Sequence, residues 1–260
     1  DILFSFNYCN NVLIIRTNLN ALDFKICKSK HSNPENWIDY IPAKNQTIIG
    51  GCTFLNKWMI RSEVRNALSK ILVRNLKTEK EDELLITDEV VISPTISLSQ
   101  KDKNTENIYR GYESPKTPSR TYLYNISTQE KKLVKEKTIP SGHNPDEYIV
   151  ERVNAKSRDN KDIPLTITYH KKTRLNGEAK LLLYGYGSYG SSMYPAFSTT
   201  NLSLINRGII WVTAHIRGGS ERGMSWWLDG KMMNKKNTFN DYIDSAEILI
   251  KKKYTSEGNI

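Results

Sequence analysis

The sequence predicts a mixed fold, in which a β-rich N-terminal segment precedes a segment of alternating strands and helices. Up to about residue 135, short apolar or alternating runs are separated by polar turns, and no long helical pattern interrupts them. Two near-continuous apolar runs follow at 181–184 and 208–214, as is typical of strands buried on both faces of a sheet. The clearest helical periodicity comes last, at 238–253. With 260 residues, of which 38% are apolar, the chain is long enough to bury a hydrophobic core.

The N-terminal strands predict the C-terminal blades of a β-propeller. Strands are expected at 2–6, 12–17, 22–28, 58–62, 68–75 and 122–126. Two of them end in similar polar turns, which begin at Asn75 and Asn125, 50 residues apart. A strand-turn-strand unit that repeats every 40–50 residues or so is typical of propeller blades. Residues 1–137 would then form a partial β-propeller of about three blades. A β-sandwich or an irregular all-β domain is the alternative.

Residues 138–260 are expected to form the N-terminal half of an α/β domain. Strands at 148–157 and 163–170 flank a polar turn, which predicts a hairpin. A helix is expected at 200–207, between the two apolar runs.

The predicted helix at 238–253 begins with a capping-box pattern, Thr238 with Asp241. Its apolar residues are expected on one buried face: Phe239, Tyr242, Ile243, Ala246, Leu249 and Ile250. Because a crossover helix leads back to the sheet, we expect a further strand to begin after Gly258.

Composition argues against several classes of function. The net charge of +10 is spread evenly over both halves of the chain, which indicates a solvated surface and no nucleic-acid partner. No apolar stretch approaches the length of a membrane span, so no membrane partner is expected. The three cysteines form no C-x-x-C pair, which favours the reducing cytoplasm. The four histidines are far apart, so neither a metal nor another cofactor is expected.

Two glycine-rich turns follow the two apolar strands. Residues 184–190 read Tyr-Gly-Tyr-Gly-Ser-Tyr-Gly, and 215–223 read His-Ile-Arg-Gly-Gly-Ser-Glu-Arg-Gly. Glycines allow a sharp turn and close approach to a ligand, and a tyrosine hydroxyl can donate to a negative oxygen. Neither turn ends in the Lys-Ser/Thr of a phosphate loop, and neither contains the G-x-S-x-G of a nucleophile elbow.

These two turns, followed by Lys-Lys-Asn-Thr-Phe-Asn-Asp-Tyr at 235–242, resemble the prolyl oligopeptidase family of serine peptidases. The branch that they resemble most is oligopeptidase B, also called protease II. The resemblance implies a β-propeller that caps an α/β-hydrolase domain. It also implies a Ser, Asp and His triad that cleaves short peptides after Lys or Arg. The similarity is strongest over 146–258.

The resemblance assigns Tyr186 to the tyrosine whose hydroxyl completes the oxyanion hole of the family. A ring packed under the turn is the structural alternative for Tyr186. For His215, a hydrogen-bonded structural role is expected, and Ser220 is expected to be a turn residue. Some bacterial members carry acidic residues that meet a second basic residue of the substrate, but here these positions are Tyr194 and Ala196. A preference for paired basic residues is therefore not implied.

The family's Gly-Gly-Ser elbow and its Asp and His would all lie beyond Ile260. We therefore expect a truncated fragment that is inactive alone, because an oxyanion donor without nucleophile and base cannot perform acyl transfer. Its partners would be a complementing chain and, once complemented, short basic peptides. The alternative is a non-catalytic module that binds peptides or partners by strand addition.

Overall fold

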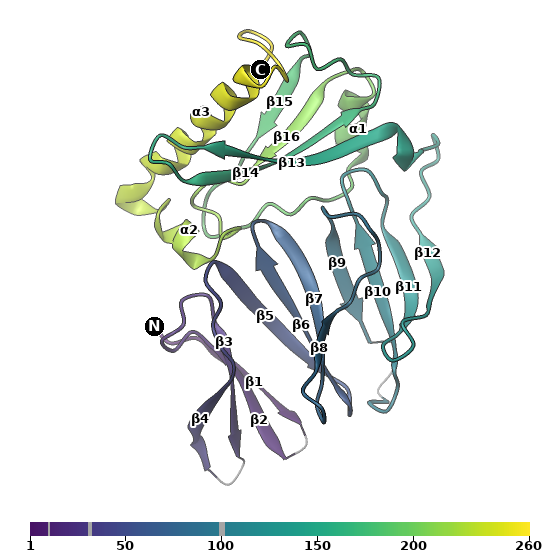
Figure 1. The fold of residues 1–260 in the computed structure, drawn as a ribbon, viewed down its shortest axis with the longest axis vertical. Coiled ribbons are helices and arrows are strands. Elements are labelled where there is room, and N and C mark those ends of the chain that lie inside the picture. Colours follow the sequence, from purple (N-terminus) through teal and green to yellow (C-terminus); the bar gives the residue numbers. More distant parts are fainter. Residues whose placement is uncertain (10, 31–32, 99–101) are drawn as a thin grey trace.

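The computed structural model describes residues 1–9, 11–30, 33–98 and 102–260. Figure 1 shows three sheets in a row, from β1–β4 at the lower left to β9–β12 at the right. A fourth sheet, which carries the helices, lies above the second and third of these sheets in this view. The predicted mixed fold, with β-sheets first and an α/β segment second, is confirmed.

Each of the first three sheets contains four strands in sequential order, and each strand runs antiparallel to the next. This is the arrangement expected of propeller blades. The first sheet consists of β1 (Phe4–Cys9), β2 (Val12–Thr17), β3 (Lys25–Lys30) and β4 (Asn33–Ile41). The second consists of β5 (Thr47–Phe54), β6 (Trp58–Arg65), β7 (Leu68–Asn75) and β8 (Glu81–Glu83). The third consists of β9 (Ser93–Ser97), β10 (Asn107–Glu113), β11 (Arg120–Asn125) and β12 (Lys131–Glu136).

Strands with a clear apolar pattern were the ones that the sequence predicted. The bounds of β2 and β7 match the prediction, whereas β1 and β3 begin two to three residues later than expected. Strand β5 was not predicted, because Gly50 and Gly51 interrupt its alternation of apolar and polar residues at a bulge between Ile49 and Cys52. Strand β12 was not predicted either, because all six of its residues are exposed and the strand has no apolar, buried face.

The predicted internal repeat is present as two matching turns. The Asn75 side chain accepts hydrogen bonds from the backbone N–H groups two and three residues later, at 2.9 and 3.0 Å. Asn125 does the same, at 3.0 Å for both bonds. In each turn the asparagine backbone N–H donates to the carbonyl five residues later, at 2.9 Å. The two turns join the third and fourth strands of neighbouring sheets, so the 50-residue spacing does reflect a repeated unit.

Apolar side chains fill the spaces between neighbouring sheets. Between the first and second sheets lie Ile14, Phe24, Ile26, Ile41, Ile49, Phe54 and Met59. A larger cluster joins the second sheet to the third: Leu55, Ile60, Ile71, Val73, Leu84, Ile86, Ile108, Tyr112, Tyr124 and Ile126.

The fourth sheet has the strand order β13-β14-β16-β15, in which only β15 and β16 are parallel to one another. Its strands are β13 (Tyr148–Lys156), β14 (Asp162–His170), β15 (Leu181–Tyr184) and β16 (Ile210–Ala214). The helices are α1 (Thr199–Ile205), α2 (Met224–Leu228) and α3 (Lys236–Lys251), with 3₁₀ turns at Pro145–Glu147 and Met232–Asn234. The predicted hairpin and the predicted helix between the two apolar runs are confirmed. After Gly258 no strand forms within the described residues, although Asn259 accepts a hydrogen bond from Leu181 of β15.

Helices α3 and α1 cover opposite faces of this sheet (Figure 1). On the α3 side lies the main core, which includes Leu165, Ile167, Ile210, Val212 and Leu249. On the α1 side, Leu202 and Ile205 pack with Tyr148 and Phe197.

The predicted start of α3 was wrong, and its predicted buried face was only partly right, because Leu249 is buried and Tyr242 packs against the core. The helix begins at Lys236, before the expected capping box, and no side chain caps it. Phe239 and Ile243 are exposed, whereas Asp241 and Ser245 are buried. The buried stripe of α3 is polar because it faces arginines from neighbouring segments, a tertiary contact that periodicity alone does not reveal.

The second glycine-rich turn rests on the propeller sheets. The Asp23 carboxylate accepts from the backbone N–H of Met224 at 2.6 Å, and the Ala67 N–H donates to the Glu221 carbonyl at 2.8 Å. Gly223 has φ +87°, and a Cβ there would lie 2.7 Å from the Asp23 carboxylate oxygens. This turn therefore joins the propeller sheets to the α/β segment.

Candidate active site

Tyr186 lies on the turn that follows β15, and its side chain is 45% exposed. Within the described part of the chain, its hydroxyl has no hydrogen-bond partner, so it is available as a donor. The next residue, Gly187, has φ +59°, and a Cβ there would lie 2.5 Å from Thr238 Cγ2 and 2.8 Å from the Arg217 carbonyl oxygen. Glycine at this position lets the turn lie directly against its support.

The second glycine-rich turn packs backbone to backbone under the first. A Cβ at Gly218, whose φ is +98°, would lie 2.0 Å from the Gly187 carbonyl oxygen. The Gly190 N–H donates to the Gly218 carbonyl at 2.9 Å. Ser220 donates to the Gly190 carbonyl at 2.6 Å, which confirms that Ser220 is a turn residue.

Lys235 and Thr238 hold the two turns from the start of α3. The Lys235 ammonium group donates to the Gly187 carbonyl and, at 2.7 Å, to the Ser188 hydroxyl. Burial lowers the pKa of Lys235. The Thr238 hydroxyl lies 2.8 Å from the Arg217 carbonyl oxygen, to which it donates. Tyr186 therefore projects from a turn that is held on several sides.

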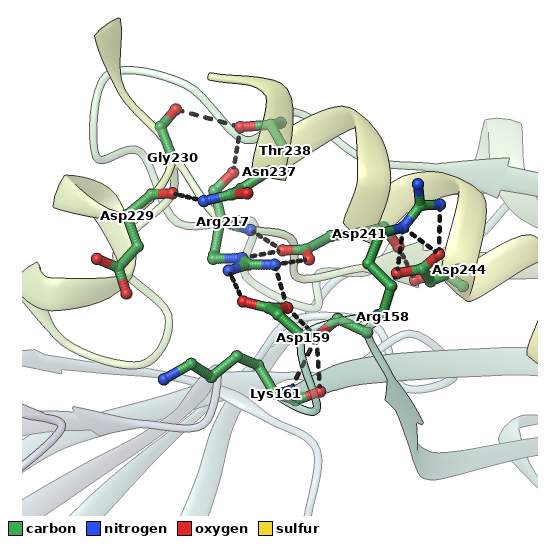
Figure 2. Close-up of polar contacts among 12 residues, drawn as sticks. Arg158, Asp159, Lys161, Arg217, Asp229, Gly230, Asn237, Thr238, Asp241 and Asp244 are labelled. Atoms are coloured by element: carbon green, nitrogen blue, oxygen red, sulfur yellow. Dashed lines mark hydrogen bonds and ion pairs between the residues drawn. The ribbon is translucent and has the colours of Figure 1, made fainter. Parts of the chain in front are cut away.

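Beneath the turns, Arg217 lies between two carboxylates (Figure 2). Its Nε and Nη2 donate to Asp241 at 2.9 and 2.6 Å, and Nη1 and Nη2 donate to Asp159 at 2.6 and 2.8 Å. The Arg217 side chain is 2% exposed and that of Asp241 is fully buried. Burial alone would lower the pKa of Arg217, but the hydrogen bonds to both carboxylates raise it. The bonds from Arg217 also lower the pKa of Asp159 to about 2.

A second pair in Figure 2 lies beside the first, where Arg158 donates to Asp244 through Nη2 at 2.7 Å. Arg158 and Asp159 both belong to the turn of the β13–β14 hairpin, and both aspartates of α3 face this turn. The two arginine–aspartate pairs thus fix the hairpin, the second glycine-rich turn and α3 to one another.

His215 is completely buried and has the structural role expected from the sequence. Its Nε2 lies 2.8 Å from the Thr166 hydroxyl, while its Nδ1 is 3.9 Å from a Glu221 carboxylate oxygen and makes no hydrogen bond within the described residues. Burial lowers the pKa of His215, so its ring is neutral at neutral pH. Since its Nε2 faces a threonine, His215 is not placed to activate a serine.

Tyr194 and Ala196 lie together at a cavity of about 140 Å³ between β14, β15, β16 and α1. Burial raises the pKa of Tyr194. No carboxylate lines this cavity, and Tyr186 is not among its lining residues. The structure therefore brings two of the three predicted site residues together and places Tyr186 on a separate turn.

Several residues that shape the site were not singled out from the sequence. Lys235 and Asp159 contact the glycine-rich turns only because of the tertiary fold. Lys235 opens the motif at 235–242, but nothing in the motif indicates this contact. Trp211 and Thr168 of the cavity could have been found, because polar or aromatic residues alternate with apolar ones in β14 and β16. The sequence predicts that the apolar strands are buried on both faces. In β16 one face is fully buried, whereas Trp211 and Thr213 on the other face are half-buried and line the cavity.

Within residues 1–9, 11–30, 33–98 and 102–260, no cluster of three or more His, Cys, Asp or Glu side chains could hold a metal ion. No helix in this described part of the chain is long and apolar enough to cross a membrane.

Comparison with known proteins defines a class in which a β-propeller is joined to a peptidase domain. Residues 5–137 match the model of the prolyl oligopeptidase N-terminal β-propeller domain, and residues 195–260 match the prolyl oligopeptidase family model. The chain belongs to the prolyl oligopeptidase family.

Two curated relatives match nearly the whole chain. Dipeptidyl aminopeptidase BI of Pseudoxanthomonas mexicana is 34% identical over 100% of this chain and 36% of its own length. Protease 2 of Moraxella lacunata is 33% identical over 98% of this chain and 36% of its own length. The chain thus spans about a third of the length of these relatives.

Solved structures agree with this assignment. Oligopeptidase B from Trypanosoma brucei, with covalently bound antipain in a closed form, is 28% identical and superposes with a TM-score of 0.90. The match covers 99% of this chain and 38% of that one. Oligopeptidase B from Leishmania major is 27% identical with a TM-score of 0.88, over 99% of this chain and 37% of that one.

Proposed function

We propose that the chain is part of a serine-type oligopeptidase of the oligopeptidase B kind, and that it supplies the tyrosine donor of the oxyanion hole. In this proposal, residues 1–137 are propeller blades and residues 138–260 begin an α/β-hydrolase domain. The substrates are short peptides that are cleaved after Lys or Arg, and the site of action is the cytoplasm. Protease 2 of Moraxella lacunata and the oligopeptidase B structures support this choice within the family.

The observation that carries the proposal is the exposed, unpartnered hydroxyl of Tyr186 on a turn held by Lys235, Thr238 and the second glycine-rich turn. A donor that is fixed before the reaction does not need to reorganise as negative charge develops on a tetrahedral intermediate. A single donor of this kind is worth about 2.7–4 kcal/mol of transition-state stabilisation.

The 260-residue chain is proposed to be inactive alone. In the described residues no histidine ring contacts a serine hydroxyl: His143 contacts a backbone carbonyl, His170 a backbone N–H and His215 a threonine. Acyl transfer by this family's chemistry needs a nucleophile with an adjacent base, and a fixed donor alone does not replace them. A complementing segment or chain would therefore supply the serine, its base and the acidic pocket for Lys or Arg.

The first test measures hydrolysis of a fluorogenic arginyl peptide by the purified chain. We expect no turnover above the rate of buffer alone, whereas a full-length relative assayed in parallel turns the substrate over. Turnover by the 260-residue chain that a serine-directed inhibitor abolishes would contradict the proposal.

The second test isolates the role of Tyr186. Residues 1–260 are joined to the C-terminal part of a full-length relative, and kcat is compared for the chimera, its Tyr186→Phe variant and its Tyr189→Phe variant. Tyr189 is a matched control because it lies on the same turn and is 87% exposed. We expect Tyr186→Phe to lower kcat by roughly 10²–10³-fold and Tyr189→Phe to leave it within about threefold. Equal effects of the two variants in an active chimera would rule out the assigned role.

The cytoplasmic assignment rests on the cysteines. Cys9, Cys27 and Cys52 are all free thiols. Burial raises the pKa of Cys27 and of Cys52 to about 11, which keeps them protonated and unreactive. The test isolates the protein from cells under thiol-trapping conditions and compares its gel mobility with and without reductant. We expect the two mobilities to be the same. A disulfide in the isolated protein would count against this location.

A further inference from the structure

The face of the fourth sheet that meets α1 carries side chains suited to binding a ring. Thr166 and Thr168 of β14 pair in register with Thr213 and Trp211 of β16. Tyr184 of β15 lies beside Thr213, and its ring stacks on Trp211 with centroids 6.1 Å apart. All five residues line the cavity that also contains Tyr194 and Ala196.

The opposite wall of this cavity comes from three other segments. The stretch from Met193 to Ala196 covers it, α1 contributes Asn201 and Ile205, and Pro115 reaches it from the propeller. Its volume of about 140 Å³ is close to that of an engineered apolar cavity of roughly 150 Å³ that binds benzene. The cavity is therefore the right size for one six-membered ring.

One buried hydroxyl in the wall has no partner within the described residues. Thr168 is 1% exposed, and its Oγ1 makes no hydrogen bond. The neighbouring hydroxyls are satisfied, because Thr166 contacts His215 at 2.8 Å and Thr213 accepts from the Trp211 indole N–H at 3.3 Å. An unsatisfied buried hydroxyl is unfavourable, so a ligand that places a polar atom at the Thr168 hydroxyl would satisfy it.

The cavity offers nothing to balance a charge. No Asp, Glu, Lys, Arg or His lines it, and burial keeps the Tyr194 hydroxyl protonated by raising its pKa. Placing an ammonium group or a carboxylate here would remove its hydration without supplying an opposite charge. A neutral ring with one polar substituent meets all of these requirements.

We propose that this cavity binds the phenol side chain of a tyrosine residue in a peptide, with the Thr168 hydroxyl hydrogen-bonded to the phenol hydroxyl. The peptide nature of the ligand rests on the proposed function, whereas the preference for a neutral phenol rests on the cavity alone. A substrate or inhibitory peptide would then be selected for a tyrosine at this position, in addition to any basic residue at the cleavage site.

Binding is measured by NMR on the ¹⁵N-labelled 260-residue chain, following the indole N–H resonance of Trp211, which a Trp211→Phe variant assigns. N-acetyl-tyrosinamide is expected to shift this resonance saturably, N-acetyl-phenylalaninamide more weakly, and N-acetyl-lysinamide not at all. Absence of a saturable shift with N-acetyl-tyrosinamide, or equal binding of the lysine compound, would overturn the proposal.

Two variants test the assigned contacts. Thr168→Val keeps the shape of the side chain and removes the hydroxyl, so it should weaken binding of N-acetyl-tyrosinamide about threefold to tenfold and leave the phenylalanine compound within about twofold. Equal weakening of both compounds would disprove the hydrogen bond. Ala196→Asp, at an exposed position of the rim, should introduce binding of N-acetyl-lysinamide, and failure to do so would show that charge does not decide selection.

A further arm distinguishes a peptide from a free phenol. N-acetyl-tyrosinamide should bind more tightly than p-cresol, because its amide groups can also contact the exposed lining residues Tyr194 and Ala196. Binding of p-cresol that is equal or tighter would identify a free phenol as the ligand and overturn the peptide assignment. None of these measurements requires a nucleophile, so a negative result here is distinct from failure of the proposed peptidase function.

Discussion

The ion pair of Arg217 should contribute far more to stability than the similar pair of Arg158. In Arg217→Met the fully buried Asp241 carboxylate loses its guanidinium partner and keeps only the Arg217 backbone N–H at 3.0 Å. In Arg158→Met, Asp244 likewise keeps the backbone N–H of residue 158, at 2.7 Å. Both variants remove a guanidinium group from an aspartate of α3. They differ in burial, since Arg217 is 2% exposed and Arg158 is 50% exposed, and in the number of partners, since Arg217 also binds Asp159.

The expected magnitudes follow from this difference in burial. Removing one partner of a buried pair costs about 3–5 kcal/mol, because a charge remains buried without compensation. A pair with a half-exposed arginine contributes much less, because solvent screens it. With a urea m-value of about 2 kcal/mol per molar, Arg217→Met should lower the unfolding midpoint by about 1.5–2.5 M, and Arg158→Met should lower it far less.

Urea unfolding at pH 7, followed by both circular dichroism and tryptophan fluorescence, measures these shifts. Trp226 is a useful reporter because its ring lies 5.7 Å from the Arg217 guanidinium. If Arg217→Met shifts the midpoint no more than Arg158→Met, burial does not decide the strength of these pairs. The assigned role of Arg217 in holding the second glycine-rich turn would then be wrong as well.

Three further predictions test other parts of the molecule by the same unfolding assay. Gly187→Ala should lower the free energy of unfolding by at least about 3 kcal/mol, because the new Cβ would meet the backbone at a position with positive φ. The control Gly142→Ala has φ +79° and open space around the Cβ, so it should cost only about 1 kcal/mol. Similar costs for the two variants would refute the close contact at Gly187. His215 is held neutral in the fold, so stability should fall as the pH drops below about 6.5, and His215→Asn should flatten this dependence; an unchanged slope would show that another group titrates. The Asp159 pKa is lowered from 3.8 to about 2, so its contribution is complete above pH 3.8 and is lost as the pH falls toward 2. Asp159→Asn should remove this acid-dependent loss, and an identical acid profile would contradict the assigned pair.

Local patterns predicted the parts of the fold in which one strand face is apolar. The bounds of β2 and β7 and the β13–β14 hairpin could be read from alternation and turn residues. The turns at Asn75 and Asn125 could be recognised because in each turn an asparagine side chain accepts hydrogen bonds from the backbone that follows it. These features depend on residues that are close in the sequence, and they need no knowledge of tertiary contacts.

The support of the candidate site could not be predicted in this way, because it depends on residues far apart in the sequence. Asp159 and Arg217 are 58 residues apart, and Lys235 lies 48 residues from the carbonyl of Gly187 that it contacts. The polar stripe of α3 reads as a solvated face until Arg217 is known to lie against Asp241. Periodicity therefore placed Phe239 in the core, whereas Phe239 is exposed. It also placed Thr238 and Asp241 in a capping box, whereas Asp241 forms an ion pair with Arg217.

The second glycine-rich turn has two supports of different strength, and this asymmetry matters for Tyr186, the proposed oxyanion donor. On the α/β side, Arg217 and Gly218 are held by a buried ion pair, by Thr238 and by backbone packing against Gly187. On the propeller side, its end is held by the Ala67 N–H and the Asp23 carboxylate. The turn that carries Tyr186 therefore remains attached to the α/β sheet if the propeller contacts loosen. The cavity around Thr168 differs, because Pro115 of the propeller forms part of its wall. Separation of the two segments would thus open the cavity while leaving the hydroxyl of Tyr186 in place.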